Sequence, residues 1–304
     1  MKVVGTTTEM RDLTRRLRRE DKTIAFVPTM GFLHEGHASL LRLARRKGDV
    51  LVLSIFVNPA QFGPSEDLDR YPRNLEGDLA IARRENVDIV FTPTPAEMYG
   101  TGFQTWIDVA EVSKPLCGAS RPGHFRGVAT VVAKLLNIVH ADVAVFGEKD
   151  FQQLAVIRRM VRDLDMDVEI LGGPLVRETD GLAMSSRNVN LSPAHRRDAL
   201  VLKRAIDRVR ELSAAGETSA GTLIAAARKV LDEVPGGETD YVEIRDASTL
   251  ETIDRLDGPA LLALAVRFGG TRLIDNTVLP VGGRVHEENP RAPIPELSGT
   301  ATPH

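Results

Sequence analysis

The sequence of 304 residues contains a single cysteine, Cys117. One cysteine cannot form an intrachain disulfide, and this composition fits the reducing cytoplasm, where we expect the protein to lie. Residues 1–9 lack the apolar core that a signal peptide needs. The longest apolar runs, such as residues 50–57 and 260–266, are too short to span a bilayer, so we expect no membrane partner.

A strong excess of charge is also missing. The 39 lysines and arginines nearly balance 42 aspartates and glutamates, which leaves a net charge of −3, and we expect no nucleic-acid partner. The sequence has no Gly-x-Gly-x-x-Gly fingerprint, no Gly-Lys-Ser/Thr P-loop and no Gly-x-Ser-x-Gly elbow. Bound phosphates must therefore be held in another way, and nothing indicates covalent catalysis by the protein.

What is present is an alternation of strand and helix patterns. Buried strands are predicted at residues 23–27, 50–57, 87–91, 143–146 and 168–171, with helices at 38–47, 79–84, 128–139 and 150–164. Such alternation is typical of an α/β protein with a Rossmann-like, doubly wound parallel sheet. We expect this domain to occupy residues 1–183.

The pattern changes after residue 188. Two helices are predicted at residues 193–213 and 219–230, followed by strands at 241–245, 261–267 and 272–279. This order predicts a smaller C-terminal α+β domain over residues 184–281. Residues 282–304 are rich in Pro, Glu, Asn and Gly without periodicity, and we expect them to be disordered.

The most specific pattern is a strand-to-helix turn at residues 27–37, Val-Pro-Thr-Met-Gly-Phe-Leu-His-Glu-Gly-His. Turns at the carboxyl ends of parallel strands bind nucleotides, and free N–H groups at a helix start attract phosphate. His34 and His37 can share one face of the helix start and donate hydrogen bonds to phosphates as charge develops. Gly36 lets a flat ring pack against its backbone, and Gly31 permits a tight turn.

A His-x-x-His pair can also be a packed or solvated pair, or part of a zinc site. Zinc is disfavoured, because structural sites need four protein ligands, catalytic sites usually need three, and Cys117 is distant. The longer phrase, a strand followed by Met-Gly-x-x-His-x-Gly-His, is much more specific. It resembles the His-x-Gly-His motif of the nucleotidylyl transferase superfamily, whose members bring the α-phosphate of ATP to a nucleophile.

Further polar loops follow other predicted strands. Lys149 suits a phosphate, while Asp150 can bind a ribose hydroxyl or begin a helix. The loop at residues 184–188, Met-Ser-Ser-Arg-Asn, offers hydroxyls and an arginine that suit a polyphosphate. Asn58 and Gln61 lie in a loop after the second strand. We expect these loops to converge with the histidine turn around one triphosphate.

Taken together, these loops resemble the pantoate–β-alanine ligase family over residues 2–281. The resemblance rests on residues 28–37 and on the phrases at 54–62, 71–73, 121–125, 146–153, 180–188 and 272–276. It implies that pantoate attacks the α-phosphate of Mg-ATP to give pantoyl adenylate and pyrophosphate. The amine of β-alanine then attacks the acyl carbon, which yields pantothenate and AMP.

The resemblance also implies site residues, a homodimer and a C-terminal domain that acts as a lid over the nucleotide. His37 would donate a proton to the departing phosphate with His34 beside it, while Lys149, Ser185 and Arg187 hold the phosphates. The implied ATP site comprises Met30, Gly31, Phe32, Leu33, His34, Glu35, Gly36, His37, Gly147, Glu148, Lys149, Asp150, Val176, Met184, Ser185, Ser186 and Arg187. Gln61 would bind pantoate and β-alanine, Gln153 would bind pantoate, and the remaining implied substrate residues are Asn58, Tyr71, Arg121 and His124.

Two positions depart from the family pattern. Cys117 stands where many members carry a glutamate, which puts the order of its loop in doubt. The acidic residues after Tyr71 are sparse, with Glu76 and Asp78 remaining. We therefore expect Mg²⁺ to be held mostly by ATP and water, and we assign it no protein ligand.

Two other functions remain open from the sequence. A nucleotidylyl transferase that moves AMP onto a phosphate ester would share His34 and His37. However, the neutral Gln61 and Gln153 suit a small hydroxy acid better than a second phosphate. A non-catalytic nucleotide-binding module is the other alternative, and the full set of phosphate-binding groups argues against it.

Overall fold

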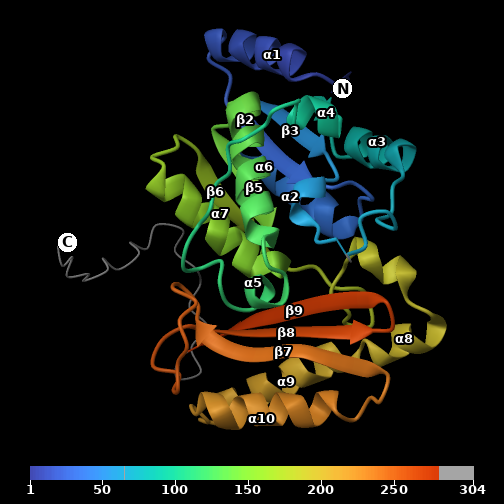
Figure 1. Ribbon diagram of the computed structural model, residues 1–304, viewed down its shortest axis with the longest axis vertical. Coiled ribbons are helices and arrows are strands. Elements are labelled where there is room, and N and C mark those ends of the chain that lie inside the picture. Colours follow the sequence, from blue (N-terminus) through green and yellow to red (C-terminus); the bar gives the residue numbers. More distant parts are fainter. Residues whose placement is uncertain (65, 281–304) are drawn as a thin grey trace, which may run out of the picture.

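The computed structural model describes residues 1–64 and 66–280. These residues form a six-stranded sheet and a three-stranded sheet, which lie one above the other in Figure 1. The predicted fold class, a doubly wound parallel sheet with a smaller α+β part, is confirmed. The tail for which we expect disorder, residues 282–304, lies outside the described residues.

The larger sheet is parallel throughout, in the order β1-β4-β3-β2-β5-β6. The chain builds outward from β2 in both directions, so the strand order reverses between β2 and β5. Ligands of doubly wound sheets bind at such a switch point, outside the carboxyl ends of the strands. The strands are β1 (Lys2–Val4), β2 (Ile24–Thr29), β3 (Val50–Ile55), β4 (Ile89–Phe91), β5 (Val143–Gly147) and β6 (Glu169–Gly173).

Helices cover both faces of this sheet, because alternate residues of its strands are apolar on opposite sides. Ile24 and Phe26 of β2 pack in one cluster with α6 and α7, while Ala25 and Val27 pack in another with α2 and α3. The first helix packs on the cluster of α6 through Leu13 and Leu17. The helices are α1 (Thr7–Arg19), α2 (Glu35–Arg45), η1 (Pro59–Gln61), α3 (Leu75–Arg84), α4 (Pro95–Met98), α5 (Cys117–Ser120), α6 (His124–Val139), η2 (Glu148–Asp150) and α7 (Phe151–Asp163).

The smaller sheet is antiparallel, in the order β7-β8-β9. Its strand β8 has two apolar faces. Leu262, Leu264 and Val266 pack with α9 and α10, whereas Leu261 and Ala263 join the core cluster of the larger sheet. The two parts therefore share buried apolar surface. The elements are η3 (Ser186–Asn190), α8 (Pro193–Asp198), α9 (Val201–Ala214), α10 (Ala220–Leu231), β7 (Gly237–Asp246), β8 (Ala260–Phe268) and β9 (Thr271–Leu279).

Four predicted helices differ from the observed ones. The helices predicted from residues 79 and 128 begin at Leu75 and His124. The helix predicted at residues 193–213 is divided into α8 and α9 by a turn at residues 199 and 200. The helix predicted from residue 38 begins at Glu35, so that His37 lies inside its first turn. Within the described ranges, no helix combines the length and the apolar character needed to cross a membrane.

Candidate active site

A cavity of about 220 Å³ lies at the carboxyl edge of the larger sheet, at the switch point between β2 and β5. Its walls bring together all five residues expected to be catalytic, namely His34, His37, Lys149, Ser185 and Arg187. They also include the expected ATP residues Met30, Gly36, Gly147, Asp150, Val176, Met184 and Ser186, and the expected substrate residues Asn58, Gln61, Tyr71, Arg121, His124 and Gln153. Loops that are distant in the sequence thus converge in space.

Five residues of the implied ATP site do not line this cavity: Gly31, Phe32, Leu33, Glu35 and Glu148. Glu35 is half-exposed and pairs with Arg42 of the same helix. The resemblance implied these residues, but Leu33 packs into the apolar cluster of α2 instead. The structure leaves no room for a side chain at Gly31, where a Cβ atom would lie 2.8 Å from Asp78 Oδ2.

Asp78 fixes the histidine turn through hydrogen bonds to its backbone. Its carboxylate is 3% exposed and accepts hydrogen bonds from the backbone N–H groups of Phe32, at 2.9 Å, and Leu33, at 2.6 Å. Gly31 and Phe32 both have positive φ, 81° and 51°, which aims these two N–H groups at one carboxylate. The sequence placed Asp78 only among residual acids near magnesium, and its structural role was missed.

The two histidines cap their own helix. The N–H of Gly36 donates to Nδ1 of His34 at 3.1 Å, and the N–H of His34 donates to Nδ1 of His37 at 3.3 Å. Histidine is not a usual N-cap residue, which explains why the helix start was predicted too late. An Nδ1 atom that accepts a hydrogen bond carries no proton, so each neutral ring has its proton on Nε2.

Burial keeps both rings neutral. It lowers the pKa of His34 to about 4, with a further contribution from the positive charge of Lys149. Burial, together with His34 and Lys149, lowers the pKa of His37 to about 3. The resemblance implied that His37 donates a proton to the departing phosphate, but at neutral pH the ring of the ligand-free protein is not an imidazolium. Its Nε2–H group can donate a hydrogen bond.

The phosphate-binding groups expected on the other loops lie around these rings. Lys149 Nζ is 3.9 Å from Asp150 Oδ2, a loose ion pair. The hydroxyl of Ser185 accepts a hydrogen bond from the N–H of Arg187, so its own proton can be donated to a ligand. Asp150 occupies the N-cap position of α7, but its side chain makes no capping hydrogen bond. A side-chain cap is therefore not its role.

One contributor from the smaller sheet was not assigned from the sequence. Asn276 of β9 donates from Nδ2 to the carbonyl oxygens of Glu148, at 3.1 Å, and Lys149, at 2.8 Å. These bonds fix the loop of Lys149 against the second part of the molecule. The residue lies in a phrase that supports the family resemblance, yet only the three-dimensional contact reveals what it does.

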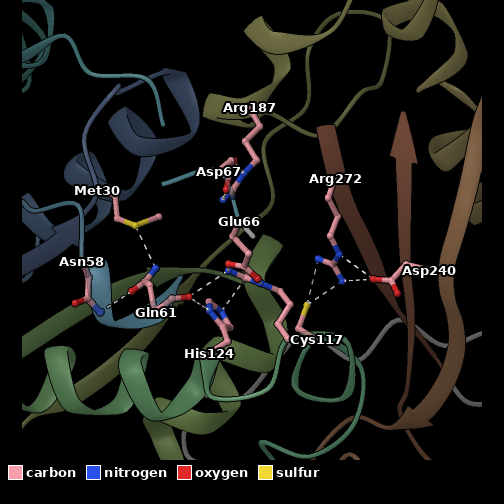
Figure 2. Close-up of polar contacts among 11 residues, drawn as sticks. Met30, Asn58, Gln61, Glu66, Asp67, Cys117, His124, Arg187, Asp240 and Arg272 are labelled. Carbon is pink, nitrogen blue, oxygen red and sulfur yellow. Dashed lines mark hydrogen bonds and ion pairs between the residues drawn. The ribbon is translucent and has the colours of Figure 1, made fainter. Parts of the chain in front are cut away.

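Gln61 also lines this cavity, and Figure 2 shows its polar contacts. Its Oε1 accepts from Asn58 at 3.0 Å, and its Nε2 lies 3.1 Å from the sulfur of Met30. Its backbone carbonyl lies 2.9 Å from His124 Nδ1. Burial, with the charge of Arg121, lowers the pKa of His124 to about 4. A neutral His124 donates from Nδ1 to this carbonyl and accepts from Arg121 at Nε2.

Arginines in the same region are paired with acids. Arg187 forms two hydrogen bonds with Asp67, at 2.7 and 3.0 Å (Figure 2). Its guanidinium also lies over the ring of Tyr71, 5.5 Å from the centroid. Arg121 pairs with Glu66 at 2.6 Å. Although burial opposes the effect, the arginine partners hold the pKa values of Asp67 and Glu66 below their usual range.

A second cavity, of about 230 Å³, lies between the two sheets and adjoins the first. Arg121, Lys149 and Arg187 line both cavities. Cys117 lies in the second, where its sulfur is 3.3 Å from the hydroxyl of Tyr241 and 3.7 Å from both terminal nitrogens of Arg272, which also pairs with Asp240 (Figure 2). Cys117 thus lies in a buried contact between the two sheets.

The switch point, the histidine turn and the convergent polar loops define a Rossmann-like α/β protein, of the class whose carboxyl edge binds nucleotides. A model of the family described as "Pantoate-beta-alanine ligase" matches residues 2–278. Curated relatives named pantothenate synthetase include one from Trichlorobacter lovleyi, 60% identical over 92% of this chain and 99% of its own. Another, from Pelobacter propionicus, is 59% identical over 92% and 99% of the two chains.

Solved structures of similar proteins indicate the same family. Pantothenate synthetase from Thermus thermophilus superposes with a TM-score of 0.87 at 47% identity, over 91% of this chain and 99% of that one. Pantoate-beta-alanine ligase from Francisella tularensis, solved with "Beta-gamma ATP and Beta-alanine", has a TM-score of 0.75 at 32% identity, over 91% and 97% of the chains. The chain therefore belongs to the pantoate–β-alanine ligase family, as its motifs predicted.

Proposed function

We propose that the protein condenses pantoate with β-alanine to form pantothenate in an ATP-dependent reaction. Pantoyl adenylate is the intermediate, and AMP and pyrophosphate are released. The observation that carries this proposal is a single cavity whose lining combines phosphate-type donors with two neutral carboxamides, Gln61 and Gln153. The Francisella relative, solved with an ATP-type ligand and β-alanine, supports the substrate assignment.

In the first step, a carboxylate oxygen of pantoate attacks the α-phosphorus of ATP. The bond from that phosphorus to the bridging oxygen breaks, and negative charge accumulates on the departing pyrophosphate. The Nε2–H groups of His34 and His37 and the ammonium of Lys149 stabilise this charge as fixed donors. His37 acts in this account as a neutral hydrogen-bond donor, because burial and its neighbours lower its pKa to about 3.

Arg187 contributes to phosphate binding when a polyphosphate replaces its carboxylate partner, Asp67. The Nε and one terminal nitrogen of Arg187 form the edge that donates to Asp67, at 2.7 and 3.0 Å. Planar guanidinium groups bind carboxylate and phosphate with the same two-pronged geometry. A polyphosphate can therefore replace Asp67 without any change in the chemistry of the contact.

The carboxamides orient the organic substrates. Among the described residues, Gln61 Nε2 has only the sulfur of Met30 as a hydrogen-bond partner, and a thioether is a weak acceptor. In the part of the chain that the structure describes, the side chain of Gln153 has no hydrogen-bond partner. Both amides can bind the hydroxyl and carboxylate oxygens of pantoate, and Gln61 later contacts β-alanine. The amine then attacks the acyl carbon, and AMP leaves.

Mg²⁺ enters as part of the Mg-ATP substrate in this proposal. Within residues 1–64 and 66–280, no group of three or more His, Cys, Asp or Glu residues is placed to hold a metal ion. Asp78, the buried acid near the turn, is occupied by two backbone N–H groups. We further propose that the protein is a cytoplasmic homodimer. Each chain has two domains, residues 1–183 and 184–281, and the second domain acts as a lid over the nucleotide.

Pantoate-dependent exchange of labelled pyrophosphate into ATP, measured without β-alanine, tests the adenylate. We expect exchange with pantoate and none without it, since adenylate formation must be reversible to return label to ATP. A transferase that moves AMP onto a phosphate ester would instead require that ester. Pantothenate formation without such exchange would rule out a free-standing adenylation step.

A further inference from the structure

Asn58 uses every hydrogen bond that its side chain can make. It is 1% exposed and precedes η1 at the end of β3. Its Oδ1 accepts from the N–H of Ala60 at 3.2 Å and the hydroxyl of Tyr99 at 2.7 Å. Its Nδ2 donates to the carbonyl of Gly127 at 3.1 Å and to Oε1 of Gln61 at 3.0 Å. A carboxamide has two donors and two acceptor lone pairs, so none remains for a ligand.

These contacts fix the direction of Gln61. The N–H of Ala60 can only donate and the carbonyl of Gly127 can only accept, so the Asn58 amide cannot be reversed. Gln61 must then present Oε1 to Asn58, which leaves its Nε2 beside the sulfur of Met30 in the cavity (Figure 2). The resemblance implied that Asn58 binds substrate, whereas the structure uses its polar atoms within the protein.

The close approach of two elements supports this arrangement. A Cβ atom at position 127 would lie 2.2 Å from the carbonyl oxygen of Ala60, so only glycine allows α6 to come this near to η1. The carbonyl of Gly127 can therefore reach the Asn58 amide. Each polar atom of the Asn58 amide thus has one hydrogen bond with the backbone, because Oδ1 accepts from the N–H of Ala60 and Nδ2 donates to the carbonyl of Gly127.

Tyr99 contacts Asn58 from outside the cavity. It follows α4, and its own N–H donates to the carbonyl of Pro95 at 2.7 Å. Its ring packs edge-on against Phe103 at 5.0 Å and stacks on Trp106 at 6.3 Å between ring centroids. Burial raises the pKa of Tyr99 to about 12, so its hydroxyl keeps its proton and donates at neutral pH.

We propose that Tyr99 is a positioning residue for the hydroxy-acid substrate. Its hydroxyl holds Asn58, and Asn58 holds Gln61 with Nε2 directed at the substrate oxygen. Without that hydroxyl, Oδ1 of Asn58 keeps only the Ala60 hydrogen bond, and the coupled amides can shift. The inference rests on the proposed function, in which Gln61 binds pantoate.

The test compares Tyr99→Phe with Trp106→Phe in pantoate-dependent pyrophosphate exchange. Tyr99→Phe keeps the ring and its packing, while Trp106→Phe alters the same aromatic cluster without touching Asn58. One lost hydrogen bond corresponds to about a 2- to 12-fold change, so we expect Tyr99→Phe to raise the KM for pantoate by about that factor. The KM for ATP should stay within about twofold in both variants, and Trp106→Phe should leave the KM for pantoate unchanged.

A double variant, Tyr99→Phe with Asn58→Ala, tests whether Tyr99 acts on Gln61 through Asn58. We expect no further rise in the KM for pantoate, because the hydroxyl has lost the group through which it acts. A normal KM in Tyr99→Phe alone, or the same fold increase in both backgrounds, would overturn the inference. Wild-type protein that lacks pantoate-dependent exchange would instead contradict the proposed function, a separate outcome.

Discussion

The two adjoining cavities differ in how their polar walls are held. The donors of His34 and His37 are neutral rings that hydrogen bonds to the local backbone orient, with Lys149 beside them. Between the sheets the groups are charged and paired with each other, as Arg187 is with Asp67 and Arg272 is with Asp240. A ligand that binds Arg187 through the edge now paired with Asp67 must displace that carboxylate.

This difference separates two tasks. Donors fixed before the reaction need no rearrangement as charge develops, which makes them effective for transition-state stabilisation. Arginines that exchange an internal carboxylate for a phosphate bind ligand with less net gain, because the original ion pair is lost. We therefore expect changes at the histidine turn to affect rate strongly, and changes at the ion pairs to affect binding modestly.

The largest effect is expected at His37. His37→Ala removes both the Nε2–H donor and the acceptor for the N–H of His34, whereas the oxygen of Asn in His37→Asn can still accept that bond. We expect both variants to slow pyrophosphate exchange by at least about 10²-fold, since both lose the donor at the phosphate. Thermal unfolding should show the additional loss of the cap in His37→Ala alone. Near-normal exchange in His37→Asn would mean that the ring only caps the helix.

An intermediate effect is expected in how the free energy of unfolding depends on pH. Burial lowers the pKa of His124 to about 4 from the ordinary value of 6.5, so the unfolded state takes up this proton first as the pH falls. Stability that is present above pH 6.5 is therefore lost between pH 6.5 and about 4, at up to about 1.4 kcal/mol per pH unit for each such histidine. Urea unfolding of His124→Asn at several pH values should show a shallower decline than wild type. An equal slope would mean that His124 titrates normally.

The smallest effect is expected at the ion pair of Arg187. Asp67→Asn keeps the shape of the side chain but releases the charge that competes with phosphate. A partly exposed ion pair contributes about 1 kcal/mol or less, so the KM for ATP should fall by up to about fivefold. The matched change Asp240→Asn, at an arginine outside the nucleotide cavity, should leave the KM for ATP unaltered. A higher KM in Asp67→Asn would show that Asp67 itself contributes to nucleotide binding.

Much of the fold could be predicted because its signals are local. Runs of apolar residues such as 50–55 mark strands covered on both faces, and their alternation with helices determines the parallel sheet. The start of α2 was predicted late because its caps are histidines. The division between α8 and α9 has no marker in the sequence that we recognise.

The site was predictable where chemistry requires a residue type, as at Lys149 or His37. It was less predictable where a residue acts on another residue. Asp78 holds a turn that lies 45 positions away, and Asn276 holds a loop 127 positions away. Such contacts are created by the fold, and no spacing within one segment reveals them. For the same reason the sequence could not show that the amide of Asn58 donates a hydrogen bond to Gln61.

The central claim is that two neutral imidazoles, each with its proton on Nε2, face the phosphates. Nitrogen-15 NMR of the histidine rings at pH 7, assigned with His34→Asn and His37→Asn, tests it directly. The account predicts an unprotonated Nδ1 and a protonated Nε2 in both rings. An imidazolium at either position, or a proton on Nδ1, would contradict it.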